Sequence, residues 1–531
     1  MPPDNQQNPV LGIDLGTTFS CIARWTGRGT EVYRNSLGAP ETQSAIYRDP
    51  ETGEILVGQI AFSRGLTDPD NVVLGVKRMM DDASQKVKLG PEEFTPVELS
   101  SRILSSLYGA VVNKFPAGLF ESRGTVVTVP YYFKAHQCEN TRAAAEMADI
   151  QCMGILQEPI AASLSYAWQL VQEHPDREDE EVVLVFDLGG GTFDLTLFRL
   201  KQQRDKLTFE VLATGGNDRL GGMDFDKCLT EKLLEKAGLS LDGLDPKEER
   251  RARQKLLLQT IITKETLSVC KATHVSVGDI IPGRHIDMGV TQEEFEKCIN
   301  QLDGNGDRIK VLGGNGEPLV DEKGKVVYKP AYLEDIREIL RQLWDTVKLK
   351  PKDVDRVIRV GGSSRIACVK RLLCDIIGEE KMYGNINESE CVAEGAALYA
   401  ACMVDSEVFG REIEITTRTC HALGVEVTDE KFAVVIPANR KAPCESFHFF
   451  TNPADNVTSM DFNVYQGSSR EVRGNTKIGT VKVSGLPPRR ARELEIKVTF
   501  RVSKDQKLSV VAEYKNEDGK TVRVQNSFTM Q

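Results

Sequence analysis

The chain has 531 residues, of which 27% are charged and 40% hydrophobic, and its formal net charge at pH 7 is -11. A chain of this length and composition folds into several globular domains, and its negative charge argues against nucleic acid as the main partner. No apolar run is long enough to span a bilayer, and the start, MPPDNQQNPV, lacks the basic and apolar regions of a secretory signal. We therefore expect no membrane partner and a cytoplasmic protein.

The twelve cysteines are scattered along the chain, without CxxC pairs or clusters with histidine. Such a distribution indicates buried thiols in a reducing compartment, and it argues against a zinc site or a disulfide framework.

The first predicted element is a glycine turn between two apolar strands. Residues 1–9 precede it as a leader that we expect to be disordered. The stretch LGIDLGTTFSCIA (Leu11–Ala23) then gives a strand, Asp14, the turn Gly16-Thr17-Thr18 and a second strand. Glycine in a strand context marks a tight turn or a close approach by a ligand.

The same pattern returns about 170 residues later. VFDLGGGTFDLTL (Val185–Leu197) again gives a strand, an aspartate, a glycine turn, a threonine and a strand. Two hairpins of one design predict two similar lobes that face each other. Their backbone N–H groups and hydroxyls can bind a polyphosphate, and Asp14 and Asp187 suit a Mg²⁺ ion held mostly through its waters.

Two further glycine loops support phosphate binding. Thr214–Asp224 adds flexible backbone, and Val360–Arg365 follows an apolar strand and precedes a helix. Amides at a strand-to-helix turn favour anions. Four such loops together predict a nucleotide phosphate site.

Apolar strands and helical patterns alternate as far as residue 404, which is typical of an α/β domain. The predicted strands include Val126–Val129, Val182–Phe186 and Val357–Val360. One helix follows from apolar residues at steps of three and four, namely Leu333, Ile336, Leu340, Leu343 and Val347. Asp303–Asp307 lacks the glycine and the glutamate of a calcium loop, and we interpret it as a turn or hairpin insertion.

The hydrophobic period becomes two after residue 410. Glu493–Ser503, Lys507–Tyr514 and Val522–Met530 alternate apolar and polar residues, which predicts an all-β sandwich. The sequence therefore divides into an α/β domain over residues 10–404, a linker over residues 405–417 and a β-sandwich over residues 418–531, with no helical lid after it.

Six motifs give the α/β part a specific resemblance. In chain order they are DLGTT, VP-x-YF, QEPIAA, DLGGGTFD, LGG-x-DFD and VGGSSRI. The set resembles the nucleotide-binding domain of the 70-kilodalton heat-shock chaperone family (DnaK-type), in the actin-like ATPase superfamily. The resemblance implies a two-lobed, ribonuclease-H-like ATPase domain followed by a peptide-binding sandwich. It implies an ATPase that hydrolyses ATP to ADP and phosphate and so controls binding of exposed apolar segments of unfolded proteins. Spacing alone indicates only a phosphotransfer ATPase.

The resemblance also assigns roles to residues around the phosphates. Asp14 and Asp187 match the carboxylates around hydrated Mg²⁺, and Lys77 matches the lysine at the γ-phosphate and the attacking water. Glu158 and Asp194 match acidic residues that position water and metal, and Thr192 matches a phosphate-contacting hydroxyl beside them. The phosphate-contacting backbone and hydroxyls match Gly16, Thr17, Thr18, Gly189, Gly190, Gly191, Gly221 and Gly222.

The nucleoside side departs from the family pattern. The matching residues are Lys264, Ser268, Gly361, Gly362, Ser363 and Arg365. However, Ile261 replaces an acidic residue, Glu265 a basic one and Ser389 an aspartate. We expect ATP to bind, but more loosely.

The coupling between ATP and peptide is also altered. Pro130 matches a relay proline, but Cys138 stands where the relay arginine belongs, and a thiol cannot replace a forked cation. Gly154 replaces an arginine that helps contact the J-domain partner. The linker Ile413–Thr416 alternates apolar and polar residues, so it can bury one face only. We therefore expect weaker or differently arranged docking, reduced or rewired coupling and an unusual or absent J-domain partner, while a nucleotide-exchange factor is a candidate partner.

In the sandwich, four residues match the lining of the family's peptide pocket: Val425, Phe450, Met460 and Phe462. Such a pocket holds an extended peptide by backbone hydrogen bonds and one apolar side chain. The alternative is that Val425, Phe450 and Phe462 are only core residues of the sandwich. Without a lid, bound peptide is expected to leave quickly.

Two other functions are compatible with the sequence. A small-molecule kinase would use the same α/β domain, but it gives the sandwich no role. A nucleotide-sensing scaffold with weak ATPase activity and one dedicated partner would explain the altered relay and linker.

Overall fold

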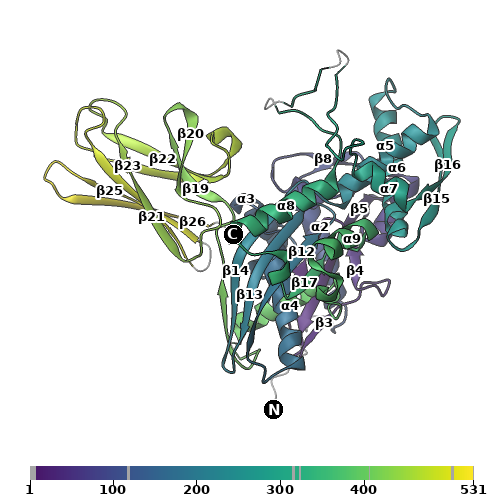
Figure 1. The fold of residues 1–531 in the computed structure, drawn as a ribbon, viewed down its shortest axis with the longest axis horizontal. Helices are drawn as coiled ribbons and strands as arrows, with labels where there is room; N and C mark the ends of the chain where they lie inside the picture. The colour runs from purple at the N-terminus through teal and green to yellow at the C-terminus, as the bar shows by residue number, and fades with distance from the viewer. Residues whose placement is uncertain are drawn as a thin grey trace.

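The computed structural model describes residues 8–116, 120–313, 317–321, 325–405, 407–503 and 507–529. Helices and strands alternate as far as helix α10 (Cys391–Val404), and only strands and short 3-10 turns follow it. In Figure 1 the later, yellow-green part lies beside the earlier part. The change from mixed α/β to β structure therefore falls where the hydrophobic period of the sequence changes.

The first large sheet contains the first aspartate hairpin. Strand β1 runs parallel to β10 and antiparallel to β2, so the chain reverses direction at residues 15–18. The strand order is β11 (Cys152–Gln157), β10 (Gly124–Val129), β1 (Val10–Asp14), β2 (Phe19–Trp25) and β3 (Thr30–Val32), and β4 (Glu41–Gln43) also pairs with β2.

The second large sheet repeats this topology around the second hairpin. Strand β12 runs parallel to β17 and antiparallel to β13, and the chain reverses at residues 189–192. The strand order is β17 (Arg356–Val360), β12 (Asp179–Leu188), β13 (Phe193–Gln202), β14 (Lys206–Asn217) and β18 (Glu412–Thr416). Both predicted hairpins are therefore confirmed. In each, the first strand has one parallel and one antiparallel neighbour.

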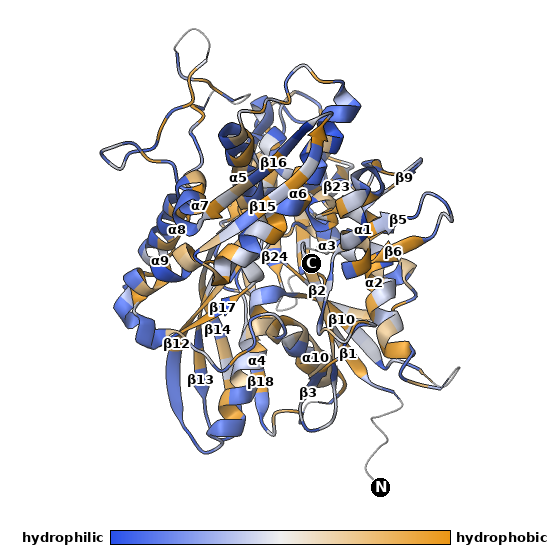
Figure 2. Cartoon of the chain, turned by 90° about the vertical axis from the view of Figure 1, so that its right-hand side faces the viewer, coloured by the Kyte–Doolittle hydropathy of each residue, from blue (hydrophilic) through white to orange (hydrophobic). Residues whose placement is uncertain are grey.

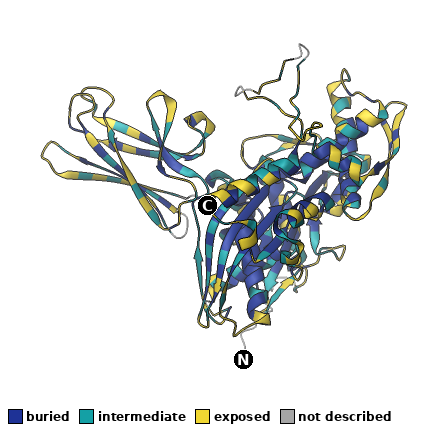
Figure 3. Ribbon diagram, in the orientation of Figure 1, coloured by how far each residue is buried: buried dark blue, intermediate teal, exposed yellow. Residues whose placement is uncertain are grey.

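Helices fill the space between the two sheets and cover their outer faces. One core cluster joins Val126 of the first sheet and Phe198 of the second to α4 (Glu158–Glu173) and α10, which lie between the sheets in Figure 2. Most strands of the two sheets are buried (Figure 3). The other helices are α1 (Gln59–Thr67), α2 (Pro96–Val112), α3 (Ala135–Met147), α5 (Gly222–Ala237), α6 (Pro246–Val269), α7 (Gln292–Ile299), α8 (Tyr332–Val347) and α9 (Ala367–Ile377).

Smaller sheets and hairpins are attached to the α/β part. They are β5 (Ala45–Arg48), β6 (Ile55–Val57) and β7 (Val72–Leu74) in one sheet, with the hairpins β8 (Val87–Leu89) to β9 (Glu92–Phe94) and β15 (Ala272–Ile281) to β16 (Arg284–Thr291). Asp303–Asp307 forms a turn closed by the Leu302–Arg308 bridge, within the larger insertion that the Asn300–Ala331 bridge encloses. The predicted helix is α8, with four of its five apolar positions buried.

Two four-stranded antiparallel sheets with a common apolar core form the C-terminal part. The alternating stretches predicted as strands are β24, β25 and β26. The first sheet has the order β20 (Lys431–Ile436), β19 (Ala422–Val427), β22 (Ser459–Gly467) and β23 (Thr476–Ser484). The second has the order β21 (Cys444–Thr451), β24 (Glu495–Val502), β25 (Lys507–Lys515) and β26 (Thr521–Thr529).

The ends of the predicted segments show two differences. Residues 1–7 of the expected leader lie outside the described residues, but Pro9 is buried and its carbonyl accepts a hydrogen bond from the Arg123 N–H. Within the predicted linker, Glu412–Thr416 forms strand β18, parallel to β14. Five of the thirteen linker residues thus belong to the second sheet. All twelve cysteines are free thiols, and among the described residues no helix is both long and apolar enough to cross a membrane.

Helix α10 lies so close to α4 that only glycine fits at their contact. A Cβ atom on Gly395 would lie 1.7 Å from the Ala161 carbonyl oxygen, whereas one on Gly109 of α2 would meet no atom within 4 Å. We expect Gly395→Ala to lower the free energy of unfolding by about 1–3 kcal/mol, because the helices must separate. Gly109→Ala is the matched control and should be neutral or slightly stabilising. Thermal unfolding of both variants checks this, and equal effects would contradict the packing argument.

Candidate functional site

The two hairpin turns touch each other. A Cβ atom on Gly190 would lie 2.0 Å from Thr18 Oγ1, and one on Gly191 would lie 2.5 Å from Thr17 Oγ1. Any side chain at these glycines would push the turns apart. The third glycine loop joins them at Gly361, which has a φ of +79° and whose Cβ would lie 2.5 Å from the Leu188 carbonyl oxygen.

A cleft of about 420 Å³ opens where these turns meet. Its walls come from the two hairpins, from α6 and from the turn that follows β17. Sixteen of the residues predicted from the sequence line it: Asp14, Gly16, Thr17, Thr18, Lys77, Glu158, Asp187, Gly189, Gly190, Thr192, Lys264, Ser268, Gly361, Gly362, Ser363 and Arg365.

Four predicted residues lie behind the cleft wall. Asp194 is buried at the start of β13, and Gly191 contacts Thr17 as described. A Cβ on Gly221 would lie 2.7 Å from the Gly190 carbonyl oxygen, and one on Gly222 would lie 2.5 Å from Ser363 Oγ. These glycines therefore allow close contact between loops.

Buried charges gather at the floor of the cleft. Lys77, in the 3-10 turn Val76–Met79, forms an ion pair with Glu158, the first residue of α4. Burial would lower the pKa of Lys77, but Glu158 and Asp14 raise it above its ordinary value. The lysine therefore stays charged within a group of carboxylates.

The surroundings of the hairpin aspartates disfavour their charged form. Burial and the neighbouring Glu158 raise the pKa of Asp14 to about 7 and that of Asp194 to about 8. The same causes raise the pKa of Asp187 well above its ordinary value. Asp194 Oδ2 also has no hydrogen-bond partner among the described residues. A cation in the cleft would stabilise the charged carboxylates and so offset the repulsion between them and Glu158.

At the other end of the cleft, two cations already have carboxylate partners. Lys264 forms an ion pair with Asp226 at 2.8 Å, and its Nζ also donates to the Gly222 carbonyl at 3.1 Å. Arg365 donates to Glu388 at 2.8 Å and to Ser389 Oγ at 2.6 Å. Glu265, the residue that departs in charge from the family pattern, lines the same end.

Arg78 is a site residue that the sequence argument missed. Its Nε donates to the Gly191 carbonyl at 2.8 Å, and its guanidinium forms an ion pair with Asp224. It thereby ties the second hairpin turn to the segment that carries Lys77. Its position next to Lys77 in the sequence could have identified it as a residue close to the site.

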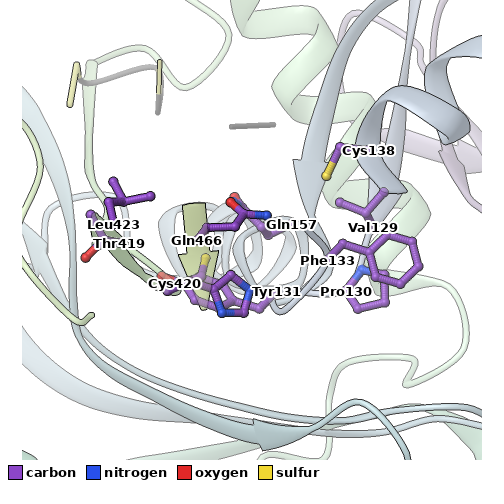
Figure 4. Close-up of a pocket in the computed structure, with 11 residues that line it drawn as sticks. Val129, Pro130, Tyr131, Phe133, Cys138, Gln157, Thr419, Cys420, Leu423 and Gln466 are labelled. Carbon is purple, nitrogen blue, oxygen red and sulfur yellow. The ribbon is translucent and has the colours of Figure 1, made fainter. Parts of the chain in front are cut away.

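The two residues predicted for coupling lie between the α/β part and the sandwich. Pro130 and Cys138 line a small cavity together with Cys420 and Gln466 of the C-terminal part (Figure 4). Burial raises the pKa of the Cys138 thiol to about 12, so this side chain is neutral where the family pattern has a cation.

Other side chains connect the two parts. Arg418 Nε donates to the Val211 carbonyl of β14 at 2.6 Å, and its Nη1 donates to the Asn439 carbonyl of the sandwich at 2.8 Å. Tyr131 Oη donates to the Arg418 carbonyl at 2.9 Å. One guanidinium thus bonds to both parts at once.

The linker strand packs its two isoleucines against the core. Ile413 and Ile415 are half-buried against the core between the sheets, while β18 pairs with β14 along its length. Glu414 and Thr416 are half-buried as well, so the alternating sequence places its apolar side chains at the core without leaving the other face exposed. The docked strand also shows that the alternating pattern does not prevent sheet pairing.

Of the residues predicted for the peptide pocket, Val425 and Phe462 are buried in the sandwich core. Phe450 and Met460 are half-buried, and the Phe450 and Phe462 ring centroids lie 5.6 Å apart. All four belong to the cluster between the two sheets, and only Phe450 and Met460 have surface to offer a ligand.

Comparison with known proteins identifies the family. Residues 10–88, 80–304 and 328–530 match the family model described as Hsp70 protein. The chain belongs to the Hsp70 family. Proteins named Chaperone protein DnaK from Thermotoga petrophila, Thermotoga maritima and Thermotoga neapolitana are each 33% identical to it over 503 residues, which cover 93% of this chain and 76% of each relative.

This Hsp70 chain is therefore an ATP-dependent molecular chaperone that binds and hydrolyses ATP, and unfolded peptides are its class of partner. The match confirms the resemblance seen in the six motifs. It favours neither the small-molecule kinase nor the nucleotide-sensing scaffold.

The raised pKa values in the cleft predict how the stability of the ligand-free protein depends on pH. Because the folded protein keeps protons on Asp14 and Asp194 that the unfolded chain releases, the cluster destabilises the fold progressively as pH rises from about 4 to about 8. Each unit of pKa shift corresponds to about 1.4 kcal/mol. We expect the melting temperature to fall less between pH 5 and pH 8 in Asp194→Asn than in the unmodified protein.

Asp176→Asn, which changes an exposed carboxylate between α4 and β12, is the control and should leave the pH dependence unchanged. Equal pH dependence in all three proteins would contradict the assignment.

Proposed function

We propose that the cleft is the ATPase site of a two-lobed, actin-like domain over residues 10–404. Residues 405–417 then form the linker, and residues 418–531 bind peptide. The repeated topology of the two hairpin-bearing sheets supports two lobes of common design. The contact between the two turns supports a single triphosphate held between them.

The carboxylates suit a Mg²⁺ ion bound through its waters. Asp187 and Asp194 are buried and Asp14 is half-buried. Asp14 and Asp194 both repel Asp187, and Asp194 Oδ2 has no hydrogen-bond partner among the described residues, so a hydrated dication matches this set. When bound, Mg²⁺ supplies neutralisation of phosphate charge. The residues that would hold it, through its waters, are Asp14 and Asp187.

Lys77 and Glu158 would act at the γ-phosphate end. Phosphoryl transfer depends on positioning and charge neutralisation, and Lys77 is a buried cation fixed by Glu158 between the two aspartate hairpins. We assign Lys77 to the γ-phosphate charge, Glu158 and Asp194 to the attacking water, and Thr192 to a phosphate oxygen. On the nucleoside side, Lys264 and Ser268 of α6 and the turn Gly361–Arg365 would hold the sugar and base.

Replacing the buried lysine tests this assignment. We expect Lys77→Ala to lower the rate of ATP hydrolysis by a factor on the order of 10²–10³, because the site loses its cation at the γ-phosphate. The measurement is single-turnover hydrolysis with Mg²⁺, together with calorimetric titration of ATP.

The control is Lys201→Ala, which removes an exposed lysine of β13 and should leave the rate unchanged. An unchanged rate in Lys77→Ala would refute its role. A failure of the unmodified protein to bind ATP at millimolar concentration would refute the cleft assignment itself.

The contacts between the two parts support rewired coupling. Position 138 holds a neutral cysteine in place of a charged relay. Arg418 instead bonds to both β14 and the sandwich, and Lys441 pairs with Glu210 of β14 at 3.0 Å. Gly154 leaves the J-domain partner unusual or absent. A nucleotide-exchange factor as a partner and a cytoplasmic location complete the proposal. The free thiols support the location, because disulfides are rare in the cytosol.

Reduced coupling predicts a small response to peptide. Coupling free energies between sites typically correspond to about 5–150-fold effects, and we expect an extended apolar peptide to raise ATP turnover by less than about fivefold. Steady-state turnover with and without saturating peptide measures this. A polar peptide of equal length is the control, and a strong acceleration by the apolar peptide would contradict reduced coupling.

A further inference from the structure

Strand β21 leaves one edge of the sandwich open. It ends the sheet β21–β24–β25–β26 and pairs with β24 alone. Outside that ladder, no backbone hydrogen bond among the described residues involves residues 444–451. An unpaired strand edge presents a row of N–H and C=O groups to which another strand can pair.

The other sheet edges are covered or contacted. On β20, the Phe432 N–H donates to the Arg470 carbonyl at 2.9 Å, and Lys431 forms a bridge with Glu471. Strands β23 and β26 contact each other across the opposite side of the sandwich, where Asn526 Nδ2 donates to the Thr480 carbonyl at 2.9 Å. Strand β21 also contacts β20, but among the described residues no backbone hydrogen bond or bridge outside the β24 ladder involves it, so its backbone edge is unpaired.

This edge carries exposed aromatic side chains. Phe447 and Phe449 are 48% and 54% exposed, and their ring centroids lie 5.6 Å apart on one face of the strand. Lys497 of β24 places its ammonium 4.3 Å from the Phe447 ring centroid. Residues Ser446–Phe450 include no acidic or basic side chain other than His448, and Glu445 at the start of the strand is paired with Arg501 of β24. The middle of the strand therefore lacks the charges, prolines or bulges that usually block an edge.

We propose that the free edge of β21 is a second peptide site, which binds an extended apolar segment as an added strand. The open backbone edge selects an extended partner. Phe447 and Phe449, two residues apart, match apolar side chains at alternate positions of that partner. Phe450, on the opposite face, belongs to the proposed central pocket, so a client bound there lies close to this edge.

The site is separate from the proposed pocket and relies on the chaperone activity only for the class of partner. It gives a client two independent points of attachment. A client bound at both sites dissociates more slowly than one bound at either site alone, because binding at the second site is intramolecular.

Isothermal titration of the full chain with ADP tests the site. The probe is an eight-residue peptide that alternates leucine and serine, the length of β21, with a terminal lysine for solubility. We expect two peptides per unmodified chain and one per Phe447→Thr/Phe449→Thr double variant, because threonine keeps the strand but removes the rings. Tyr328→Thr, which removes an exposed aromatic from the hairpin insertion, is the control and should retain two.

Hydrogen exchange of the backbone amides supplies a second readout. Strand addition should slow exchange over residues 444–451 when peptide is added, by about tenfold or more, and the double variant should lose this protection. Its ATP turnover and melting temperature should match those of the unmodified chain, which shows that it folds.

Three results would overturn the inference. One peptide per chain in every protein, with unchanged exchange in β21, leaves the chaperone function intact and removes the second site. Protection of β21 without peptide, in a chain that light scattering shows to be a dimer, assigns the edge to a second copy. The third is no binding of peptide by any of the proteins, and it also contradicts the proposed peptide binding.

Discussion

The close contact between two glycine turns governs this structure. Gly190 and Gly191 of one hairpin lie against Thr18 and Thr17 of the other, at distances that leave no space for a Cβ atom. Two sheets from distant parts of the sequence can therefore bring their strand ends to one place. The cleft, the clustered carboxylates and the position of Lys77 all depend on that contact.

The contact has an electrostatic consequence. Since Asp14 and Asp187 end equivalent strands, the meeting of the turns forces their carboxylates into a common buried space, with Glu158 and Asp194 beside them. Lys77 compensates only part of this charge, and the pKa values of the aspartates rise accordingly. A site that is electrostatically unsatisfied when empty has a physical reason to bind a cation with its anionic ligand.

The α/β part and the sandwich are joined by sheet pairing and hydrogen bonds. The linker strand β18 extends the second sheet and packs Ile413 and Ile415, both half-buried, against the core between the sheets. Hydrogen bonds from Arg418 and Tyr131 to carbonyl groups join the parts. The ion pair between Lys441 and Glu210 adds a charged contact. Hydrogen bonds to carbonyl groups, and not a buried arginine relay, thus supply most of the contacts described at this interface.

The sequence by itself determined the class of the elements with a clear hydrophobic period and most of the cleft. Asp14 and Asp187 could be paired because each follows an apolar strand and precedes a glycine turn, a local pattern that survives in any tertiary context. The period-two strands and helix α8 were predictable for the same reason, since burial on one face fixes the spacing of apolar residues.

Only the tertiary structure decided which residues meet. Arg78 reaches Gly191, 113 positions away, and Arg418 reaches Val211 across 207 positions, and no local pattern encodes such a partner. The burial of Val425 and Phe462 and the exposure of Phe447 and Phe449 depend on how two sheets stack, because alternation in a strand defines two faces but not which of them another sheet will cover.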